Sequence, residues 1–172
     1  MKQHISRIRS AATILDDYGQ RLGLEFVGPK TFRDGHLYPF VFDLKGILSL
    51  IKEVNCRNVG MIMDSFHLYT SGGKIDDIKT IDCNLAIHAH LSDIIPGISI
   101  DQQMDRNRRM PHLGGIVDNV GFLSTLNEIG YDGPVSAEPF ACEETSALSN
   151  DEIAIQTFDI LSGLFREANI KF

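Results

Sequence analysis

The chain has 172 residues, of which 43% are hydrophobic and 23% are charged, and its formal net charge is −7. This composition is typical of a folded globular domain and argues against a disordered chain. The acidic balance argues against a nucleic-acid partner, because a phosphate-binding surface needs an excess of basic residues. No apolar run approaches the roughly 20 residues that span a bilayer, so no membrane partner is expected.

Helices and short apolar strands alternate along the first part of the chain. A helix is expected over 5–18, where apolar residues recur at helical spacing, and a strand over 22–27, which Gly28 and Pro29 stop. Asp43 is typical of a helix N-cap. The helix after it carries one apolar face, made by Leu44, Ile47, Leu50, Ile51 and Val54.

The rest of the chain repeats this alternation. Strands are expected over 58–63, 85–90 and 134–138, and helical segments over 74–81, 120–129 and 151–168. A long loop over 91–115 interrupts the pattern, and loops of that length are often functional. Strands that are almost wholly apolar are buried on both faces, as in a parallel sheet covered by helices. The sequence therefore predicts a single α/β unit over 1–172.

The three cysteines, Cys56, Cys83 and Cys142, are widely spaced and form neither a CxxC pair nor a disulfide pattern. Such cysteines are typical of a reducing compartment, where they act as buried hydrophobic side chains. The N-terminal segment lacks the apolar stretch of a secretory signal peptide. We therefore expect a cytoplasmic protein.

A side chain of a metal-binding type lies at or near the end of each of four predicted strands: Glu25, Asp64, His90 and Glu138. The carboxyl ends of parallel strands meet at one edge of a sheet, and functional residues gather there. Three carboxylates with one imidazole suit a divalent cation. The alternative is that these are unrelated polar residues at strand ends, but four equivalent positions favour a shared metal site.

Two further residues each follow a proposed ligand by three positions. His67 follows Asp64, and it is either a catalytic or substrate-contacting group or a loop histidine bonded to the backbone. Asp93 follows His90, and it could orient the His90 ring or bind substrate hydroxyls. His88 shares a strand face with His90 and is expected to lie one layer deeper, with a structural role.

The long loop carries a basic cluster of Arg106, Arg108 and Arg109. An arginine at this place suits a phosphate, a carboxylate or a polarised substrate oxygen. Solvated loop arginines are the alternative, chiefly for Arg106 and Arg108. No GxGxxG motif follows a strand and no P-loop is present, so dinucleotides and nucleoside triphosphates are not expected.

These segments, in this order, resemble the xylose isomerase-like TIM-barrel superfamily. The resemblance is carried by residues 24–29, 63–67, 88–93, 109–111, 129–134 and 137–140. Within the superfamily the chain is most similar to sugar phosphate isomerases and epimerases, in particular the inosose isomerases of inositol catabolism. A complete barrel typically needs ~250 residues. The resemblance therefore implies a half barrel, made of the last helix of the first half and the four C-terminal strand–helix units.

The resemblance also implies one divalent ion, Mn, Mg, Co or Zn, held by Glu25, Asp64, His90 and Glu138. In the family chemistry, Glu25 and Glu138 move a proton next to a carbonyl, through an enediolate whose charge the ion stabilises. His67 would assist them and contact the substrate, and the arginine before the loop proline favours Arg109 as a further substrate contact. The family's Pro-Gly-x-Gly turn is replaced by residues 111–115, Pro-His-Leu-Gly-Gly, so the substrate preference is not implied.

The expected function is thus isomerisation or epimerisation of a small molecule: a sugar, a sugar phosphate or a keto-inositol. The alternatives are a keto-inositol dehydratase, a catalytically silent half barrel, and a phosphodiesterase of the endonuclease type. The last would need several zinc ions and more histidines than can be placed. Four strands without closure leave two open edges, so we expect a homo-oligomer or pairing with a separate N-terminal half.

Overall fold

The computed structural model describes residues 1–38, 40–140 and 145–171, so Cys142 lies outside the described residues. Its centre is a four-stranded sheet in the order β1-β2-β3-β4. The strands are β1 (Leu22–Leu24), β2 (Val59–Asp64), β3 (Ala86–Leu91) and β4 (Val135–Ala137). Every neighbouring pair is parallel, which confirms the predicted parallel α/β fold.

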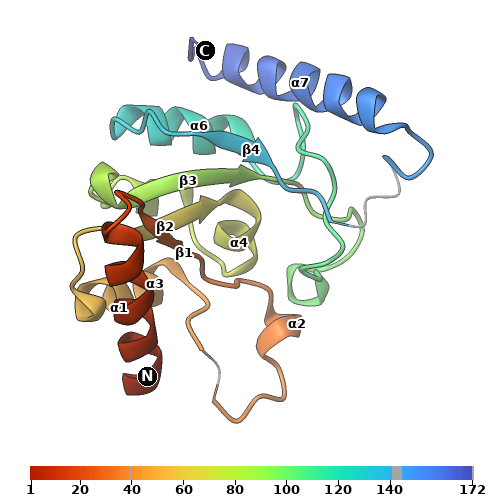
Figure 1. Cartoon of the computed structure of the whole chain (residues 1–172). Coiled ribbons are helices and arrows are strands. Elements are labelled where there is room, and N and C mark those ends of the chain that lie inside the picture. Colours follow the sequence, from red (N-terminus) through yellow and green to blue (C-terminus); the bar gives the residue numbers. More distant parts are fainter. Residues whose placement is uncertain (39, 141–144, 172) are drawn as a thin grey trace.

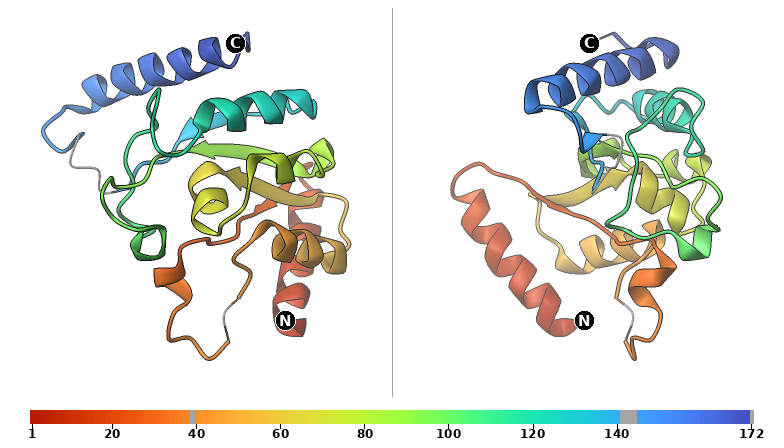
Figure 2. Two further views of the ribbon diagram at one scale, coloured as in Figure 1. Left: turned by 180° about the vertical axis from the view of Figure 1, so that it is seen from behind. Right: turned by 90° about the vertical axis from the view of Figure 1, so that its right-hand side faces the viewer.

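Helices connect the strands and cover the sheet (Figure 1). The longer ones are α1 (Lys2–Asp16), α3 (Leu44–Val54), α6 (Asn119–Glu128) and α7 (Asn150–Glu167). Helix α3 packs on β2 and α1, and α7 packs on β4 and α6. The two chain ends consequently lie at opposite ends of the array (Figure 2). Among the helices of the described residues, none combines the length and the apolar character needed to cross a bilayer.

Short helical segments occupy the connections: α2 (Lys30–Arg33), α4 (Ser65–Thr70), α5 (Ile75–Ile78), and the 3₁₀ turns η1 (Cys83–Leu85) and η2 (Ile100–Gln102). The sequence did not predict α2, α4 or η2. It also placed Leu85 in a strand, where the structure has the last residue of η1. The first strand ends at Leu24, three residues earlier than predicted, because the chain then leaves the sheet toward α2.

Local sequence explains the long elements. The Asp43 carboxylate accepts a hydrogen bond from the Gly46 amide at 2.7 Å, which confirms Asp43 as the N-cap of α3. In β2, Met61 and Met63 are buried in the main hydrophobic core, while Ile62 between them is half-buried on the other face. This alternation places residues 62 and 64 on one face, which is also the face of His88 and His90 in the paired strand.

Candidate metal centre

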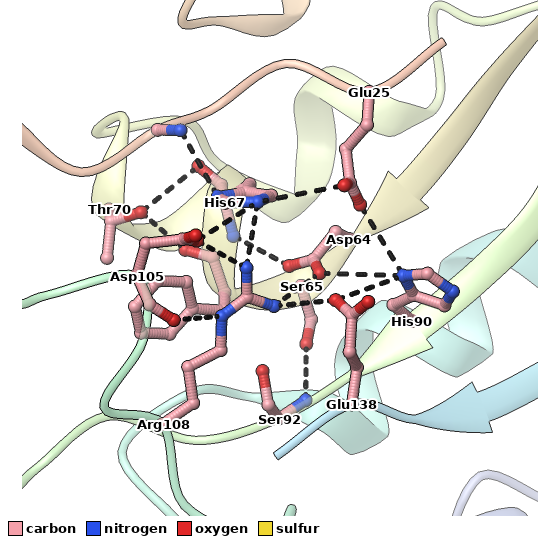
Figure 3. A network of polar contacts seen from close by, with 12 residues as sticks. Glu25, Asp64, Ser65, His67, Thr70, His90, Ser92, Asp105, Arg108 and Glu138 are labelled. Carbon is pink, nitrogen blue, oxygen red and sulfur yellow. Dashed lines mark hydrogen bonds and ion pairs between the residues drawn. The ribbon is translucent and has the colours of Figure 1, made fainter. Parts of the chain in front are cut away.

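Four side chains meet at the carboxyl end of the sheet (Figure 3). Glu25 directly follows β1, Asp64 ends β2, His90 lies in β3 and Glu138 directly follows β4. Each offers one possible ligand atom, and these atoms all lie within 4.8 Å of one another. The structure thus brings together the four residues that the strand ends indicated.

His90 lies at the centre of this cluster. Its Nδ1 is 3.2 Å from Glu138 Oε2, 3.4 Å from Glu25 Oε1 and 3.9 Å from Asp64 Oδ2. The contact with Glu138, followed by that with Glu25, raises the pKa of His90 to about 10. Two carboxylates therefore stabilise the charged form of the ring when no cation is bound.

Two of the ligand atoms have no hydrogen-bond partner. Among the described residues, Glu25 Oε1 and His90 Nδ1 are both buried and unpaired, because the ring nitrogen is close to the carboxylates but not aligned for a hydrogen bond. Buried polar atoms without partners are rare, because leaving one unpaired is costly. Two such atoms 3.4 Å apart, beside two further carboxylates, fit a divalent cation.

Arg108 provides positive charge inside the cluster. Its side chain is 1% exposed, and its Nη1 donates to Asp64 Oδ2 and to Glu138 Oε2, both at 2.9 Å. Burial alone would raise the pKa of Glu138, but the contact with His90 and the charges of His90 and Arg108 lower it to about 2. For Asp64, which is fully enclosed, burial is the largest influence and raises the pKa.

The sequence favoured Arg109 over Arg108 as the arginine that contacts the substrate. The structure pairs the backbone of Arg109 with that of Asp93, through hydrogen bonds of 2.9 and 3.0 Å. Neighbouring side chains in an extended segment point to opposite sides, so the basic cluster alone could not indicate which arginine enters the site. Arg108 was therefore named only as a member of the basic cluster, its partner Asp105 was missed, and the substrate role of Arg109 stays a prediction.

His67 lies beside the cluster and is 1% exposed. Its backbone amide donates to Asp64 Oδ1 at 2.8 Å, since Asp64 is the N-cap of α4. On the ring, Nδ1 is 3.2 Å from the Gly28 amide, and Nε2 is 2.9 Å from Arg108 Nη2. Both neighbours are donors, and a neutral imidazole accepts through only one nitrogen, so the ring can satisfy only one of them at a time.

Asp93 lies in the long loop with its side chain enclosed. Its Oδ1 accepts from the amides of Ile94 and Val117, at 2.8 and 3.0 Å, and its Oδ2 accepts from the amide of Ile116 at 3.1 Å. Three backbone amides therefore hold this carboxylate in the loop. Its predicted contact with substrate stays a prediction.

His88 lies next to His90 on the same face of β3. The two rings meet edge to face with centroids 4.8 Å apart, and His88 Nε2 is 2.8 Å from Ser136 Oγ. Burial, followed by the charge of His90, lowers the pKa of His88. A neutral His88 that is bonded to β4 agrees with the structural role predicted for it.

Comparisons with known proteins point to one family. A family model described as xylose isomerase-like TIM barrel matches residues 1–162. The inosose isomerase of Bacillus subtilis is 29% identical over 167 residues, which is 95% of this chain and 57% of that protein. The inosose isomerase of Bacillus licheniformis is 30% identical over 156 residues, or 89% of this chain and 53% of that protein.

Solved structures agree. A xylose isomerase domain protein from Alicyclobacillus acidocaldarius superposes with a TM-score of 0.85 at 32% identity, over 97% of this chain and 60% of that one. An IolI protein with a bound zinc atom gives 0.80 at 27% identity, over 95% of this chain and 55% of that one. The chain thus spans little more than half the length of the relatives that it matches.

Proposed function

The chain belongs to the xylose isomerase-like TIM-barrel family, and we propose on that premise that it is a divalent-metal-dependent isomerase or epimerase of a sugar, a sugar phosphate or a keto-inositol. The observation that carries this proposal is the cluster of Glu25, Asp64, His90 and Glu138, with its two unpaired buried ligand atoms. The likeness to an IolI protein with a bound zinc atom supports the cation. The relatives are longer than this chain, so their activity enters here as a proposal.

Glu25, Asp64, His90 and Glu138 would hold the cation. When bound, a Mn, Mg, Co or Zn ion would supply positive charge next to the carbonyl and hydroxyl oxygens of the substrate. The donor set of three carboxylates and one imidazole is acceptable to all four metals and does not choose among them.

Glu25 and Glu138 approach His90 Nδ1 from two sides, at 3.4 and 3.2 Å. One carboxylate can take the proton from the carbon next to the carbonyl, while the electron pair of that C–H bond moves toward the carbonyl oxygen. The other can deliver a proton to the adjacent carbon or to the opposite face of the same carbon. The first outcome is an isomerisation, in which the hydroxyl proton of the first carbon also moves to the former carbonyl oxygen. The second outcome is an epimerisation.

Arg108 and His67 lie beside the candidate ligands: Arg108 contacts Asp64 and Glu138, and His67 Nε2 is 4.0 Å from Glu25 Oε2. Arg108 Nη2 and His67 Nε2 are 2.9 Å apart, and both groups are buried. A buried guanidinium that is already fixed in place stabilises negative charge on a substrate oxygen. His67 Nε2 faces a donor of Arg108 and can accept from it, which helps to fix the guanidinium. We therefore assign Arg108 to the oxygen, with His67, Arg109 and Asp93 retained as predicted contacts of the substrate.

Solvent-hydrogen exchange tests the proposed function. The chain loaded with Mn²⁺ or Co²⁺ is incubated in D₂O with a keto-inositol or a ketose, and NMR follows the hydrogen next to the carbonyl. We expect deuterium at that carbon, no exchange after chelation, and a loss of about 100-fold or more in Glu25→Gln and Glu138→Gln. Loss of water from the substrate would indicate a dehydratase, and bound metal without exchange would indicate a silent half barrel.

The open sheet edges support a partner for this chain. β1 and β4 are the outer strands, and each pairs on one side only among the described residues. An unpaired edge favours pairing with another strand. We propose that a second copy, or a separate N-terminal half, completes the sheet, and the solution mass of the purified chain would distinguish a monomer from an oligomer.

A further inference from the structure

A cavity of about 270 Å³ opens beside the metal ligand Glu25. Apart from Glu25, it is lined by the segment that leaves β1 and folds back on itself, where the Val27 amide donates to the Val41 carbonyl at 3.5 Å. The side chains that give the cavity its chemistry are Glu25, Arg33, His36, Phe32, Tyr38 and Phe40. A ligand in this cavity would therefore also touch the candidate metal centre.

Arg33 supplies a positive charge to this cavity, and no carboxylate of the described residues pairs with it. Its guanidinium carbon is 4.1 Å from the centroid of the Phe42 ring, which fixes the side chain against the loop. Its Nη1 is buried without a hydrogen-bond partner, and Arg33 forms no ion pair within the described part of the chain. Its neighbour Lys30, in contrast, is paired with Asp101 at 2.7 Å.

This arrangement selects a class of ligand. An arginine with free donors binds planar or tetrahedral anions such as carboxylates and phosphates. Typical pockets for drug-sized ligands are roughly 300–1,000 Å³, so this smaller cavity suits a sugar-sized ligand rather than a nucleotide. The aromatic side chains Phe32 and Phe40 supply an apolar wall that would contact the carbon skeleton of such a ligand.

We propose that Arg33 binds an anionic group, a phosphate or a carboxylate, at the end of the substrate that is remote from the reacting carbon. The substrate is then an anionic sugar derivative rather than a neutral sugar or inosose. This inference rests on the proposed function, because the cavity meets the candidate catalytic centre only through Glu25. The competing explanation is that Arg33 stabilises the loop through Phe42 alone.

A binding experiment separates the two explanations without depending on turnover. Calorimetry on the full chain, with and without Mn²⁺, measures four probes: inorganic phosphate, a ketopentose 5-phosphate, the same ketopentose without phosphate, and a sugar acid. The variants are Arg33→Met, Arg33→Lys and, as a matched control, Arg7→Met on the exposed surface of α1. Circular dichroism and melting temperature verify that each variant is folded.

We expect an anionic probe to bind more tightly than the neutral ketopentose. Arg33→Met should reduce that preference by about tenfold or more, the loss expected for one charge-assisted contact. Arg33→Lys should retain part of the preference, and Arg7→Met should retain all of it. Tighter binding of the ketopentose 5-phosphate would identify a phosphate subsite, and tighter binding of the sugar acid a carboxylate subsite.

Equal affinity for the anionic and neutral probes, or an unchanged preference in Arg33→Met, would overturn the inference. Solvent-hydrogen exchange on the neutral ketopentose is measured in parallel with the parent chain. Anion binding that depends on Arg33, without any exchange, would leave the subsite standing and reject the proposed function. Exchange without an anion preference would leave the proposed function standing and reject the subsite.

Discussion

Arg108 sets the charge balance of the candidate site. Its guanidinium contacts Asp64 and Glu138 through Nη1 and Asp105 through Nη2, the latter at 2.5 Å. Without a cation, this side chain and His90 are the positive groups among the carboxylates of the cluster. The stability of the metal-free chain should therefore depend on Arg108.

Arg108→Met removes this buried charge and keeps much of the side-chain volume. Removing one partner of a buried ion pair typically costs 3–5 kcal/mol, about the loss that we expect in the free energy of unfolding of the metal-free chain. A divalent ion should restore more stability to the variant than to the parent, because it supplies the missing positive charge. Denaturant unfolding with chelator and with Mn²⁺ measures both effects. Arg57→Met, which breaks an exposed pair with Asp16, is the control. It should change neither the stability of the metal-free chain nor the gain in stability from the ion.

The raised pKa of His90 predicts that metal binding depends on pH. The folded-state pKa of about 10 lies above the ordinary 6.5, so the proton stabilises the metal-free fold below pH 6.5, and this stabilisation is lost as the pH rises through about 10. A cation needs the lone pair of Nδ1 and must displace that proton. We expect about one proton released per ion near pH 7, and tighter binding as the pH rises. Calorimetry in buffers of different ionisation enthalpy counts the protons, and release of none would contradict the assignment.

The three amides on Asp93 lead to a test of its role. Asp93→Asn replaces one acceptor oxygen by a donor that faces backbone amides, and it should lower the free energy of unfolding by about 2 kcal/mol. Metal affinity should change little. If Asp93 instead serves the substrate, the variant would keep the parent's stability and show a raised KM. Asp159→Asn, on the exposed surface of α7, is the control for loss of one negative charge.

At the scale of elements, the strands were the predictable part. Each apolar run ends on a polar side chain, and a parallel sheet brings such ends together, so Glu25, Asp64, His90 and Glu138 could be found from the sequence. Helix α4 could not be predicted from the sequence, because all but one of its residues are buried and no polar face indicates a helix.

The long loop was predicted from the sequence, but its path was not. Its path depends on contacts such as the Gln103 side chain, which donates to the carbonyls of Ile95 and Ile98 at 2.9 and 3.0 Å. Arg108 and Asp105 reach the site only because of that path. No local pattern of residues encodes such tertiary contacts, and for this reason Arg109 was favoured over Arg108 from the sequence.

The turn after β1 approaches α4 so closely that Gly28 has no room for a side chain. A Cβ at Gly28 would overlap the carbonyl oxygen of His67 and lie 2.7 Å from Thr70 Oγ1. Gly28→Ala should therefore cost about 1–3 kcal/mol of unfolding free energy and displace the His67 ring. In the control Gly163→Ala, the nearest atom is Leu113 Cδ1 at 3.4 Å, so α7 should gain a few tenths of a kcal/mol or remain unchanged. Thermal unfolding compares them, and equal stability of the two variants would contradict the close approach.

At the scale of the whole molecule, this chain spans little more than half the length of its relatives and forms an open sheet. All four candidate ligands nevertheless lie in or directly after its own strands. Metal binding is therefore expected from this chain alone, whereas turnover is expected to depend also on what covers the open edges. Binding and turnover must be measured separately for this reason.

The most direct test of the candidate metal centre is an equilibrium titration of the purified, metal-free chain with Co²⁺. The change in visible absorption and elemental analysis of the dialysed protein together give the stoichiometry. We predict one ion per chain in the parent and at least about 100-fold weaker binding in Asp64→Asn and His90→Gln, which exceeds the loss expected for an outer-shell partner. The exposed variant Glu128→Gln should bind like the parent. A parent chain that binds no ion, or an Asp64→Asn, His90→Gln double variant that retains it, would contradict the site.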